Sequence, residues 1–307
     1  MYQFDLLKTN PKATELLELY SPLIPEERYR CCLLGKDPDD IPDTIIIAFA
    51  ATYKEFPVGL ILASYHTILK ETNIHSLYVQ PEYRQQHISL NLMQHILEEA
   101  RKRGSLNFTC IYPLNDPYTA AMEKIFASIG WTESRPFMLR CMFNVYLFNT
   151  PWIHQDYPFP PDYEEFPWTE LTSEDRQELK HMDSQQMIPS SISPFIEEER
   201  IEPINSLGLR YKGKIVGWCI THRIAPNTIR YTSLFILPSL QFRKLAMKLL
   251  SDSIRMHTIT PTPWATFDVP ILNVHYSWMH LVKHRLAPYA DKVIHFQQAW
   301  HVYIKNN

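Results

Sequence analysis

Residues 79–90 read Val-Gln-Pro-Glu-Tyr-Arg-Gln-Gln-His-Ile-Ser-Leu. The preceding residues, 74–79, are rich in apolar and β-branched side chains and are predicted to form a strand, which Pro81 would end. From residue 88 to 100 the apolar residues recur at helical spacing, and Gly104 would end the helix. The stretch therefore predicts a strand, a short turn and the start of an amphipathic helix.

Such a junction can bind an anion. The first backbone N–H groups of a helix have no partner within the helix, and they lie at the positive end of its dipole. A phosphate or pyrophosphate can be held there without a charged side chain. A single junction of this kind is common and usually marks only a chain reversal, so its meaning depends on the surrounding sequence.

The surrounding sequence contains an internal repeat. Ser76-Leu-Tyr-Val-Gln-Pro81 recurs as Ser233-Leu-Phe-Ile-Leu-Pro238, an offset of 157 residues (from 76 to 233). The same offset carries Arg84 onto Gln241, and Phe143-Asn-Val-Tyr146 onto Trp300-His-Val-Tyr303. Agreement at several separated places indicates a duplication. We expect domains at residues 1–148 and 163–307, joined by a proline- and aromatic-rich linker at 149–162.

Both copies predict the same order of elements. In the first copy, strands are expected at 44–52, 58–66 and 74–79, then the helix, a strand at 108–112, a second helix at 118–129 and a strand at 138–146. The second copy repeats the pattern from residue 207 onward. The predicted fold class is α+β, twice: a mixed, largely antiparallel sheet with flanking helices.

The composition excludes several classes of partner. Thirty Lys and Arg against 33 Asp and Glu give a formal net charge of −3, which does not suggest a nucleic-acid-binding surface. No signal-like N-terminus and no apolar stretch of membrane-spanning length is present, so we expect a cytoplasmic protein without membrane contact. His280 and His284 would share a helical face, but no Glu accompanies them as in a zinc-hydrolase helix, and we expect no metal.

The repeated stretch resembles the signature of the GNAT superfamily of N-acyltransferases, in which a strand, a Pro-containing turn and a helix bind the pyrophosphate of coenzyme A. Arg84 matches the first position of that signature, with His87 at its first glycine and Ser89 at its second small residue. In the second copy Lys244 stands at the glycine and Ala246 keeps the small residue. The resemblance covers nearly the whole chain and implies acetyl-CoA as co-substrate.

The resemblance also implies a set of binding residues. Third-strand backbone positions would contact the acetyl group, the turn and helix start would hold the pyrophosphate, and an Asn after the next strand would contact coenzyme A. In this sequence the cofactor-binding candidates are Leu77, Tyr78, Val79, Arg84, Gln85, Gln86, His87, Ile88, Ser89, Asn115, Phe235, Ile236, Gln241, Phe242, Arg243, Lys244, Leu245 and Ala246; Asn273 is the second-copy counterpart of Asn115.

The catalytic candidates depart from the family pattern. The family base is often a Glu on the third strand; here His75 lies nearby, with an ordinary pKa suited to accepting a proton, although a structural histidine would give the same pattern. The family acid is often a Tyr on the last helix, but Phe126 and Lys283 stand at that position. Tyr112 and Tyr118 are possible substitutes, of which Tyr118 is our candidate.

The sequence thus predicts an acetyl-CoA-dependent N-acetyltransferase acting on a small-molecule or peptide amine. The alternative is an acyl-CoA-binding or scaffold protein that has lost catalysis, which the altered glycines and the absence of the family tyrosine would explain. The acceptor amine cannot be read from the sequence, because acceptor loops vary widely among proteins with one fold.

Overall fold

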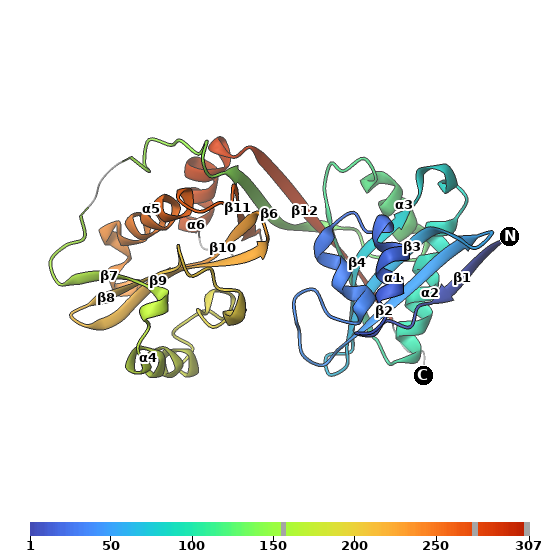
Figure 1. The fold of residues 1–307 in the computed structure, drawn as a ribbon, viewed down its shortest axis with the longest axis horizontal. Helices are drawn as coiled ribbons and strands as arrows, with labels where there is room; N and C mark the ends of the chain where they lie inside the picture. The colour runs from blue at the N-terminus through green and yellow to red at the C-terminus, as the bar shows by residue number, and fades with distance from the viewer. Residues whose placement is uncertain (155–157, 272–275, 304–307) are drawn as a thin grey trace. The chain divides into compact units, whose positions relative to one another are not determined.

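The computed structural model describes residues 1–154, 158–271 and 276–303, with 241–243 and 276–278 described by their backbone alone. The chain forms two compact units (Figure 1). Unit 1 comprises Met1–Phe137 and His295–Asn307, and unit 2 comprises Met138–Ile294. Each unit contains one part of a mixed sheet, with helices on its faces. The predicted α+β class with two tandem domains is confirmed.

Unit 1 has six strands in the order β1-β2-β3-β4-β5-β12. Neighbouring strands are antiparallel except β4 and β5, which are parallel. Their bounds are β1 Tyr2–Leu6, β2 Thr44–Tyr53, β3 Phe56–His66, β4 Glu71–Val79, β5 Asn107–Pro113 and β12 Lys292–Val302; the helices are α1 Thr14–Tyr20, η1 Ser21–Leu23, η2 Glu27–Leu34, η3 Pro81–Tyr83, α2 Ile88–Lys102 and α3 Thr119–Ser128.

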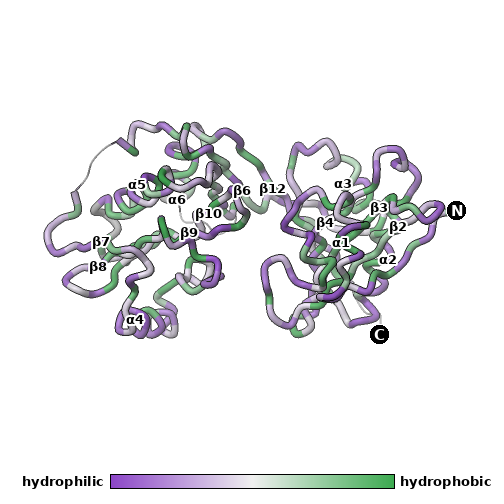
Figure 2. Tube along the Cα trace, viewed as in Figure 1, coloured by the Kyte–Doolittle hydropathy of each residue, from purple (hydrophilic) through white to green (hydrophobic). Residues whose placement is uncertain are grey.

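Helices cover both faces of the unit 1 sheet. Along β2, Ile47 and Phe49 join a core with α2, whereas Ile46 and Ala48 join a second core with α1 and η2. A strand buried on both faces needs apolar residues at every position, which explains the unbroken run Ile-Ile-Ile-Ala-Phe-Ala-Ala. Figure 2 shows β2 and β3 as largely hydrophobic.

Unit 2 repeats this arrangement with strands in the order β6-β11-β10-β9-β8-β7. The pair β10 and β11 is parallel, as β4 and β5 are in unit 1. The strands are β6 Arg135–Asn144, β7 Tyr163–Pro167, β8 Leu207–Tyr211, β9 Lys214–Ala225, β10 Thr228–Ile236 and β11 Trp264–Pro270; the helices are α4 Ser173–Ser184, η4 Trp168–Glu170, η5 Ser190–Ile192, η6 Glu198–Arg200, η7 Pro238–Arg243, α5 Leu245–Thr258, α6 Tyr276–Leu281, η8 Val282–Leu286 and η9 Ala287–Tyr289.

Matching glycines on the second long strand of each unit make close contacts near the strand-to-helix junction. A Cβ on Gly59 of β3 would lie 3.2 Å from side-chain atoms of Ile88 and Leu92 at the start of α2. A Cβ on Gly217 of β9 would lie 2.4 Å from the Ile236 side chain at the end of β10. Gly59 therefore lets α2 pack closely on the unit 1 sheet, and Gly217 leaves room for the end of β10 in unit 2.

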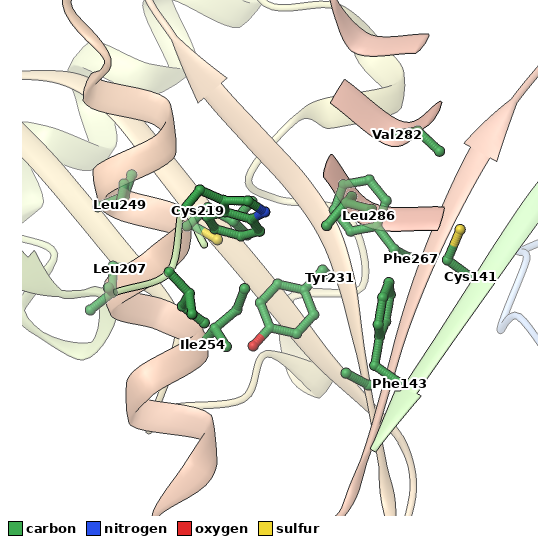
Figure 3. Close-up of a cluster of buried hydrophobic side chains, with 14 of the residues drawn as sticks. Cys141, Phe143, Leu207, Cys219, Tyr231, Leu249, Ile254, Phe267, Val282 and Leu286 are labelled. Atoms are coloured by element: carbon green, nitrogen blue, oxygen red, sulfur yellow. The ribbon is translucent and has the colours of Figure 1, made fainter. Parts of the chain in front are cut away.

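The units do not follow the two halves of the sequence, because the last strand of each half pairs in the other unit. Residues of β6 pair with β11, from Trp264↔Asn144 to Pro270↔Met138. Residues of β12 pair with β5, from Phe296↔Pro113 to Val302↔Asn107. Figure 3 shows Cys141 and Phe143 of β6 in the core of unit 2. We keep residues 1–148 and 163–307 as the proposed duplicated segments, whose final strands are exchanged.

The proposed linker, residues 149–162, packs largely on unit 2. Its described residues form turns and irregular chain, and positions 155–157 lie outside the described residues. Trp152 and Ile153 are buried in the unit 2 core, and the Trp152 indole N–H donates to the Arg285 carbonyl oxygen at 3.0 Å. Trp152 and Phe159 therefore anchor this segment on unit 2.

Candidate active site

The parallel strands at the centre of each unit separate partway along their length. In unit 1, β4 pairs with β5 only from Glu71↔Asn107 to Ile74↔Cys110. In unit 2, β10 pairs with β11 only from Thr228↔Trp264 to Tyr231↔Phe267. Among the described pairings, the rest of β4 and β10 is paired on one side only, with β3 and β9. Backbone groups on the open side are therefore available to a ligand.

A β-bulge marks the point of separation in both units. The β3–β4 register passes from Ala63↔Ile74 to Leu62↔Ser76, so His75 has no residue opposite it. The β9–β10 register passes over Thr232 in the same way. A bulge bends its strand and re-aims the extra side chain. The two positions that the repeat aligns, 75 and 232, thus share one irregular geometry.

The strand-to-helix junctions also match. His87 precedes α2 with φ 60° and ψ 9°, and Lys244 precedes α5 with φ 56° and ψ 12°, both left-handed and without a side-chain cap. A left-handed backbone favours glycine by about 1 kcal/mol, which explains why the GNAT signature has one there. Both side chains are exposed and neither is buried over its junction.

The amides at the start of α2 are available. The first backbone N–H of this helix with a described acceptor is that of Asn91, which donates to the His87 carbonyl oxygen at 3.0 Å. In the described hydrogen bonds, no amide from residue 85 to 90 is a donor. In unit 2 the corresponding first bond runs from the Lys248 N–H to the Lys244 carbonyl oxygen at 3.1 Å. Such an array suits a pyrophosphate.

Arg84 and Tyr118 meet beside the unit 1 junction. The Arg84 guanidinium lies 4.3 Å from the centre of the Tyr118 ring, and its Nε donates to the Val79 carbonyl oxygen at 3.0 Å. Tyr118 precedes α3 and is 52% exposed. The structure thus brings a predicted phosphate-site residue and the predicted acid together, although they are far apart in sequence. A guanidinium on a tyrosine ring holds both groups in place.

His75 lies on the α1 side of the unit 1 sheet, with its side chain 11% exposed. Its Nε2 lies 2.8 Å from the Ser64 Oγ, and its ring stacks on Tyr29 with centres 5.3 Å apart. Asp37 Oδ2 lies 4.0 Å from the same nitrogen. Burial lowers the pKa of His75 to about 4, although the Asp37 charge acts in the opposite direction. His75 is therefore neutral at pH 7.

The other predicted residues divide between the two faces and the exposed turn. Leu77 packs toward the α2 core and Tyr78 toward the α1 core. Ile236 packs in the α5 core, whereas Phe235 stacks on Trp218 on the α4 side. Val79, Ile88 and Leu245 are buried; Ser89 and Ala246 are half-buried; Gln85, Gln86 and Asn115 are exposed. The side chains of Gln241, Phe242 and Arg243, and all of Asn273, lie outside the described residues.

The position of the family acid contains no proton donor. Phe126 is buried, and its ring stacks on Trp131 at 4.6 Å between centres. Tyr112 is buried beside it, with its hydroxyl 3.5 Å from Glu123 Oε1, and burial raises its pKa. Neither side chain is suited to protonating a leaving thiolate, so Tyr118 remains the candidate acid in unit 1.

Unit 2 places a closed polar cluster at the position of His75. His222 of β9 contacts the Thr232 hydroxyl through Nδ1 at 2.6 Å and the Ile196 carbonyl oxygen through Nε2 at 2.9 Å. Arg230 contacts Thr232 Oγ1 at 3.1 Å and Glu197 Oε1 at 2.5 Å. Burial lowers the pKa of His222. Arg230 thus joins Thr232 to Glu197 inside the fold, while the other Glu197 oxygen, Oε2, lies 3.5 Å from Arg200 Nη1 and has no hydrogen-bond partner among the described residues.

The sequence reasoning missed Asp37, Ser64 and the Arg230–Glu197 pair. A signal for Ser64 was present: the offset of 158 that aligns Gly59 with Gly217 also aligns Ser64 with His222. Asp37 lies in an acidic loop without a repeat counterpart. In the described part of the chain, no cluster of three or more metal-ligating side chains occurs and no helix is long and apolar enough to cross a bilayer.

Comparison with known proteins agrees with this geometry. Residues 11–126 match the acetyltransferase (GNAT) family model. A tandem GNAT protein from the clavulanic acid biosynthesis pathway, solved without AcCoA, is similar at TM-score 0.68 and 13% identity over 96% of this chain and 98% of that one. A GCN5-related N-acetyltransferase from Sphaerobacter thermophilus is similar at TM-score 0.59 and 12% identity over 96% and 95%.

A third solved structure is similar over nearly the whole chain. It is the GCN5-related glucosamine N-acetyltransferase region of a fungal multi-domain GH3 β-N-acetylglucosaminidase, at TM-score 0.57 and 9% identity, over 98% of this chain and 38% of that one. Curated proteins give no match to this sequence. Residues 11–126, which lie within unit 1, thus match the GNAT family, and the chain as a whole has the tandem GNAT fold.

Proposed function

We propose that the protein is an N-acyltransferase that moves an acetyl group from acetyl-CoA to an amine, with unit 1 as the catalytic unit. The observation that carries this proposal is the β4–α2 junction. The backbone N–H groups of residues 85–90 donate no described hydrogen bond, and they lie directly after the part of β4 that has separated from β5. A pyrophosphate at the amides and a thioester along the open strand would account for both features.

In the proposed reaction the amine nitrogen attacks the thioester carbonyl carbon. The C–S bond of the tetrahedral intermediate then breaks, and coenzyme A leaves as a thiolate that must gain a proton. The Gln80 N–H donates to the Val58 carbonyl oxygen at the end of β3, and N–H groups alternate in direction along a strand, so those of Leu77 and Val79 face the open side of β4. These two are the proposed donors to the carbonyl oxygen. The pyrophosphate would position the thioester beside them.

His75 and Tyr118 are the proposed acid–base pair. The pKa of His75 is about 4, so its neutral ring is a weak base. It suits a nitrogen that has already bonded to the carbonyl carbon, because that bond makes the N–H more acidic. The Tyr118 hydroxyl would donate a proton to the thiolate, with its ring held by Arg84. We expect the acceptor to be a small-molecule or peptide amine in the cytoplasm.

Thiol release tests the proposal. The purified chain is incubated with acetyl-CoA and a panel of amines, and free thiol is followed over time. We expect at least one amine to raise thiol release, and His75→Gln and Tyr118→Phe to lower kcat by about 100-fold or more. Arg103→Gln, an exposed change at the far end of α2, is the control. If none of the amines in the panel raised thiol release, the proposal would be contradicted.

A second function is favoured by Phe126. Since the family acid position holds a buried phenylalanine, the chain could bind acyl-CoA without catalysis, as a scaffold. Calorimetric titration with coenzyme A separates the cases. Binding together with turnover supports the transferase, whereas binding without turnover of any amine supports the scaffold. The stoichiometry of the titration also counts the occupied junctions.

A further inference from the structure

The polar cluster around His75 contains a carboxylate with an unpaired oxygen. The Asp37 side chain is 4% exposed. Its Oδ1 accepts the N–H groups of Asp39 at 2.9 Å and Ile41 at 3.3 Å. Its Oδ2 is buried with no hydrogen-bond partner among the described residues. An unpaired buried carboxylate oxygen is costly, so a cationic donor placed there would be bound strongly.

The nearest internal cation is engaged elsewhere. Arg28 is close enough to affect the pKa of His75. Its guanidinium, however, donates to Glu26 at 3.3 Å and to the Tyr29 hydroxyl, and its centre lies 4.4 Å from the Tyr29 ring centre. In the described contacts, no Lys or Arg side chain of unit 1 is paired with Asp37.

Unit 2 has a cation in its version of this cluster, although Oε2 of Glu197 there also lacks a hydrogen-bond partner among the described residues. Arg230 lies opposite His222 in the β9–β10 ladder, two residues before the bulge at Thr232. Its guanidinium bridges the Thr232 hydroxyl and the Glu197 carboxylate. Like Asp37, Glu197 comes from the segment between the first helix and the second strand of its unit. A cation thus joins the acid to the bulge.

In unit 1 the corresponding residue is not a cation. Asn73 lies opposite Ser64, two residues before the bulge at His75, which is the position of Arg230. Its Oδ1 accepts the Thr109 hydroxyl. An asparagine is shorter than an arginine and carries no charge. Unit 1 therefore keeps the acid and the bulge of unit 2 but lacks the cation between them.

We propose that the Asp37 carboxylate binds a cationic group of the acceptor at the place that the Arg230 guanidinium takes in unit 2; this inference rests on the acyl transfer proposed above. A buried carboxylate raises the pKa of an ammonium paired with it, so that nitrogen keeps its proton and is not the nucleophile. The acceptor therefore carries a second nitrogen that attacks: it is a diamine, or an amine with a guanidinium. Because the Asp37 side chain is covered, entry of the acceptor would require residues 35–43 to move.

Amine binding tests the subsite without requiring turnover. The full chain is titrated calorimetrically with 1,4-diaminobutane in the presence of coenzyme A. We expect Asp37→Asn to weaken binding by about 10-fold or more, the effect of losing one charged hydrogen bond. Asn at 37 keeps an oxygen for the amides of Asp39 and Ile41. Asp43→Asn is the matched control: the same charge change in the same loop, at an exposed residue with φ 56°, which Asn tolerates.

Asn73→Arg tests the same subsite with Asp37 in place. The new side chain would supply in unit 1 the cation that unit 2 already has, so we expect it to abolish 1,4-diaminobutane binding while coenzyme A still binds. If Asp37→Asn fails to fold, this variant still decides the question. Unchanged diamine affinity in a folded Asp37→Asn or Asn73→Arg protein would overturn the inference.

Turnover separates the failure of this inference from that of the proposed function. We expect acetyl-CoA to be consumed with 1,4-diaminobutane and much more slowly with butylamine, whose single nitrogen would be held at Asp37. Equal turnover of the two amines, unaffected by Asp37→Asn, would overturn the inference and leave the transferase standing. Diamine binding that depends on Asp37, without turnover of any amine, would support the subsite and contradict the transferase.

Discussion

Units 1 and 2 place an imidazole beside a hydroxyl at the same point of the sheet, but with the two residues exchanged. In unit 1 the imidazole, His75, is on the bulged strand and the hydroxyl, Ser64, is on its neighbour, 2.8 Å apart. In unit 2 the hydroxyl, Thr232, is on the bulged strand and the imidazole, His222, is on its neighbour, 2.6 Å apart. The imidazole–hydroxyl contact is therefore present in both units, although the residue types at the two positions differ between them.

The surroundings of this shared contact differ in charge. Unit 2 pairs its acid, Glu197, with Arg230 inside the fold, whereas no Lys or Arg side chain among the described contacts pairs with Asp37 in unit 1. Unit 2 therefore supplies a cation to this cluster from its own residues, and in unit 1 we propose that the acceptor supplies it. We expect catalysis in unit 1 and a mainly structural role for unit 2.

The largest expected loss of stability comes from placing a charge in the exchanged strand β12, or in β11, which pairs with the exchanged strand β6. Ala299 of β12 is buried in the core of unit 1, and Ala265 of β11 is buried in the core of unit 2. Either alanine changed to aspartate would bury an unpaired charge, which costs about 3 to 5 kcal/mol. Ala299→Asp should therefore unfold unit 1, and Ala265→Asp unit 2. Hydrogen exchange read by mass spectrometry would locate the loss.

Because of the strand exchange, Ala299→Asp tests to which unit β12 belongs. If β12 belonged to the unit of its own sequence half, Ala299→Asp would expose the amides of β8 to β11 instead of those of β2 to β5. Exchange that rises in the unit 2 strands and leaves the unit 1 strands protected would contradict the observed pairing.

A smaller effect is expected in acid, in both units. Burial lowers the pKa of His75 and of His257 to about 4, from an ordinary value of 6.5. As the pH falls, the unfolded chain protonates these histidines before the folded chain does. Their contribution to the free energy of unfolding is therefore fully present above about pH 6.5 and is lost as the pH falls toward 4. The loss is at most about 3 kcal/mol per histidine. Urea unfolding between pH 7.5 and 4.5 would measure it.

His75→Gln sharpens this comparison between the units. The variant removes the titrating group from unit 1, while His257 remains in unit 2, bonded to the Thr262 carbonyl oxygen at 3.0 Å. We expect the acid loss of unit 1 to shrink and that of unit 2 to persist. Equal acid losses in the variant and the parent protein would mean that His75 does not titrate below its ordinary range.

In unit 2 alone, one group is expected to lower the stability as the pH rises, the opposite of the histidine effect. Burial and the nearby Asp252 raise the pKa of Glu165 to about 7, so the cost of ionising it grows as the pH rises from 4.5 and is complete above 7. Unit 1 has Phe4 and His95 at these places, with rings 5.3 Å apart. Glu165→Gln should stabilise unit 2 at pH 8 by about 1 to 2 kcal/mol, allowing for partial exposure.

Glutamate 164 provides the control for that change. It is the exposed neighbour of Glu165 on the same strand, β7. Glu164→Gln should leave the urea midpoint of unit 2 unchanged at pH 8, and Glu165→Gln should have little effect at pH 4.5. A gain in stability for Glu165→Gln that is the same at both pH values would argue against a raised pKa.

The smallest effect is expected at the two left-handed junction residues. His87→Gly and Lys244→Gly would each relieve a strained backbone and stabilise the folded chain by about 1 kcal/mol, because both φ values are near 60°. Thermal unfolding would measure this gain. Alanine at either position keeps the Cβ and should give no such gain, so a gain with alanine would mean that strain is not the cause.

Much of the fold could be predicted from the sequence because its periodic segments are long. The helix α2 and the strands β2, β3 and β4 were predicted within a few residues of their observed bounds, since each buries a regular apolar face. The strands β1 and β7 were missed, because they are short and partly exposed. The pairing of β6 and β12 was not predicted either, since an apolar pattern specifies a strand but not its neighbour.

The candidate site was harder to predict, because its contacts join distant parts of the chain. His75 could be selected from its place on the third strand, but its partners Asp37 and Ser64 come from other elements, and its lowered pKa follows from burial by them. Tyr118 was selected as an acid without any indication that Arg84 would lie against its ring. Residue types suggest chemistry, whereas neighbours and burial decide it.

The exchange of β6 and β12 also constrains how the protein is made. During synthesis the first five strands of unit 1 leave the ribosome early, but the strand that pairs with β5 is β12, which follows all the strands of unit 2. The N-terminal unit is therefore the last to be completed, and until then β5 has an open edge that could pair with other chains. A chain whose synthesis ends before β12 would therefore have an incomplete unit 1.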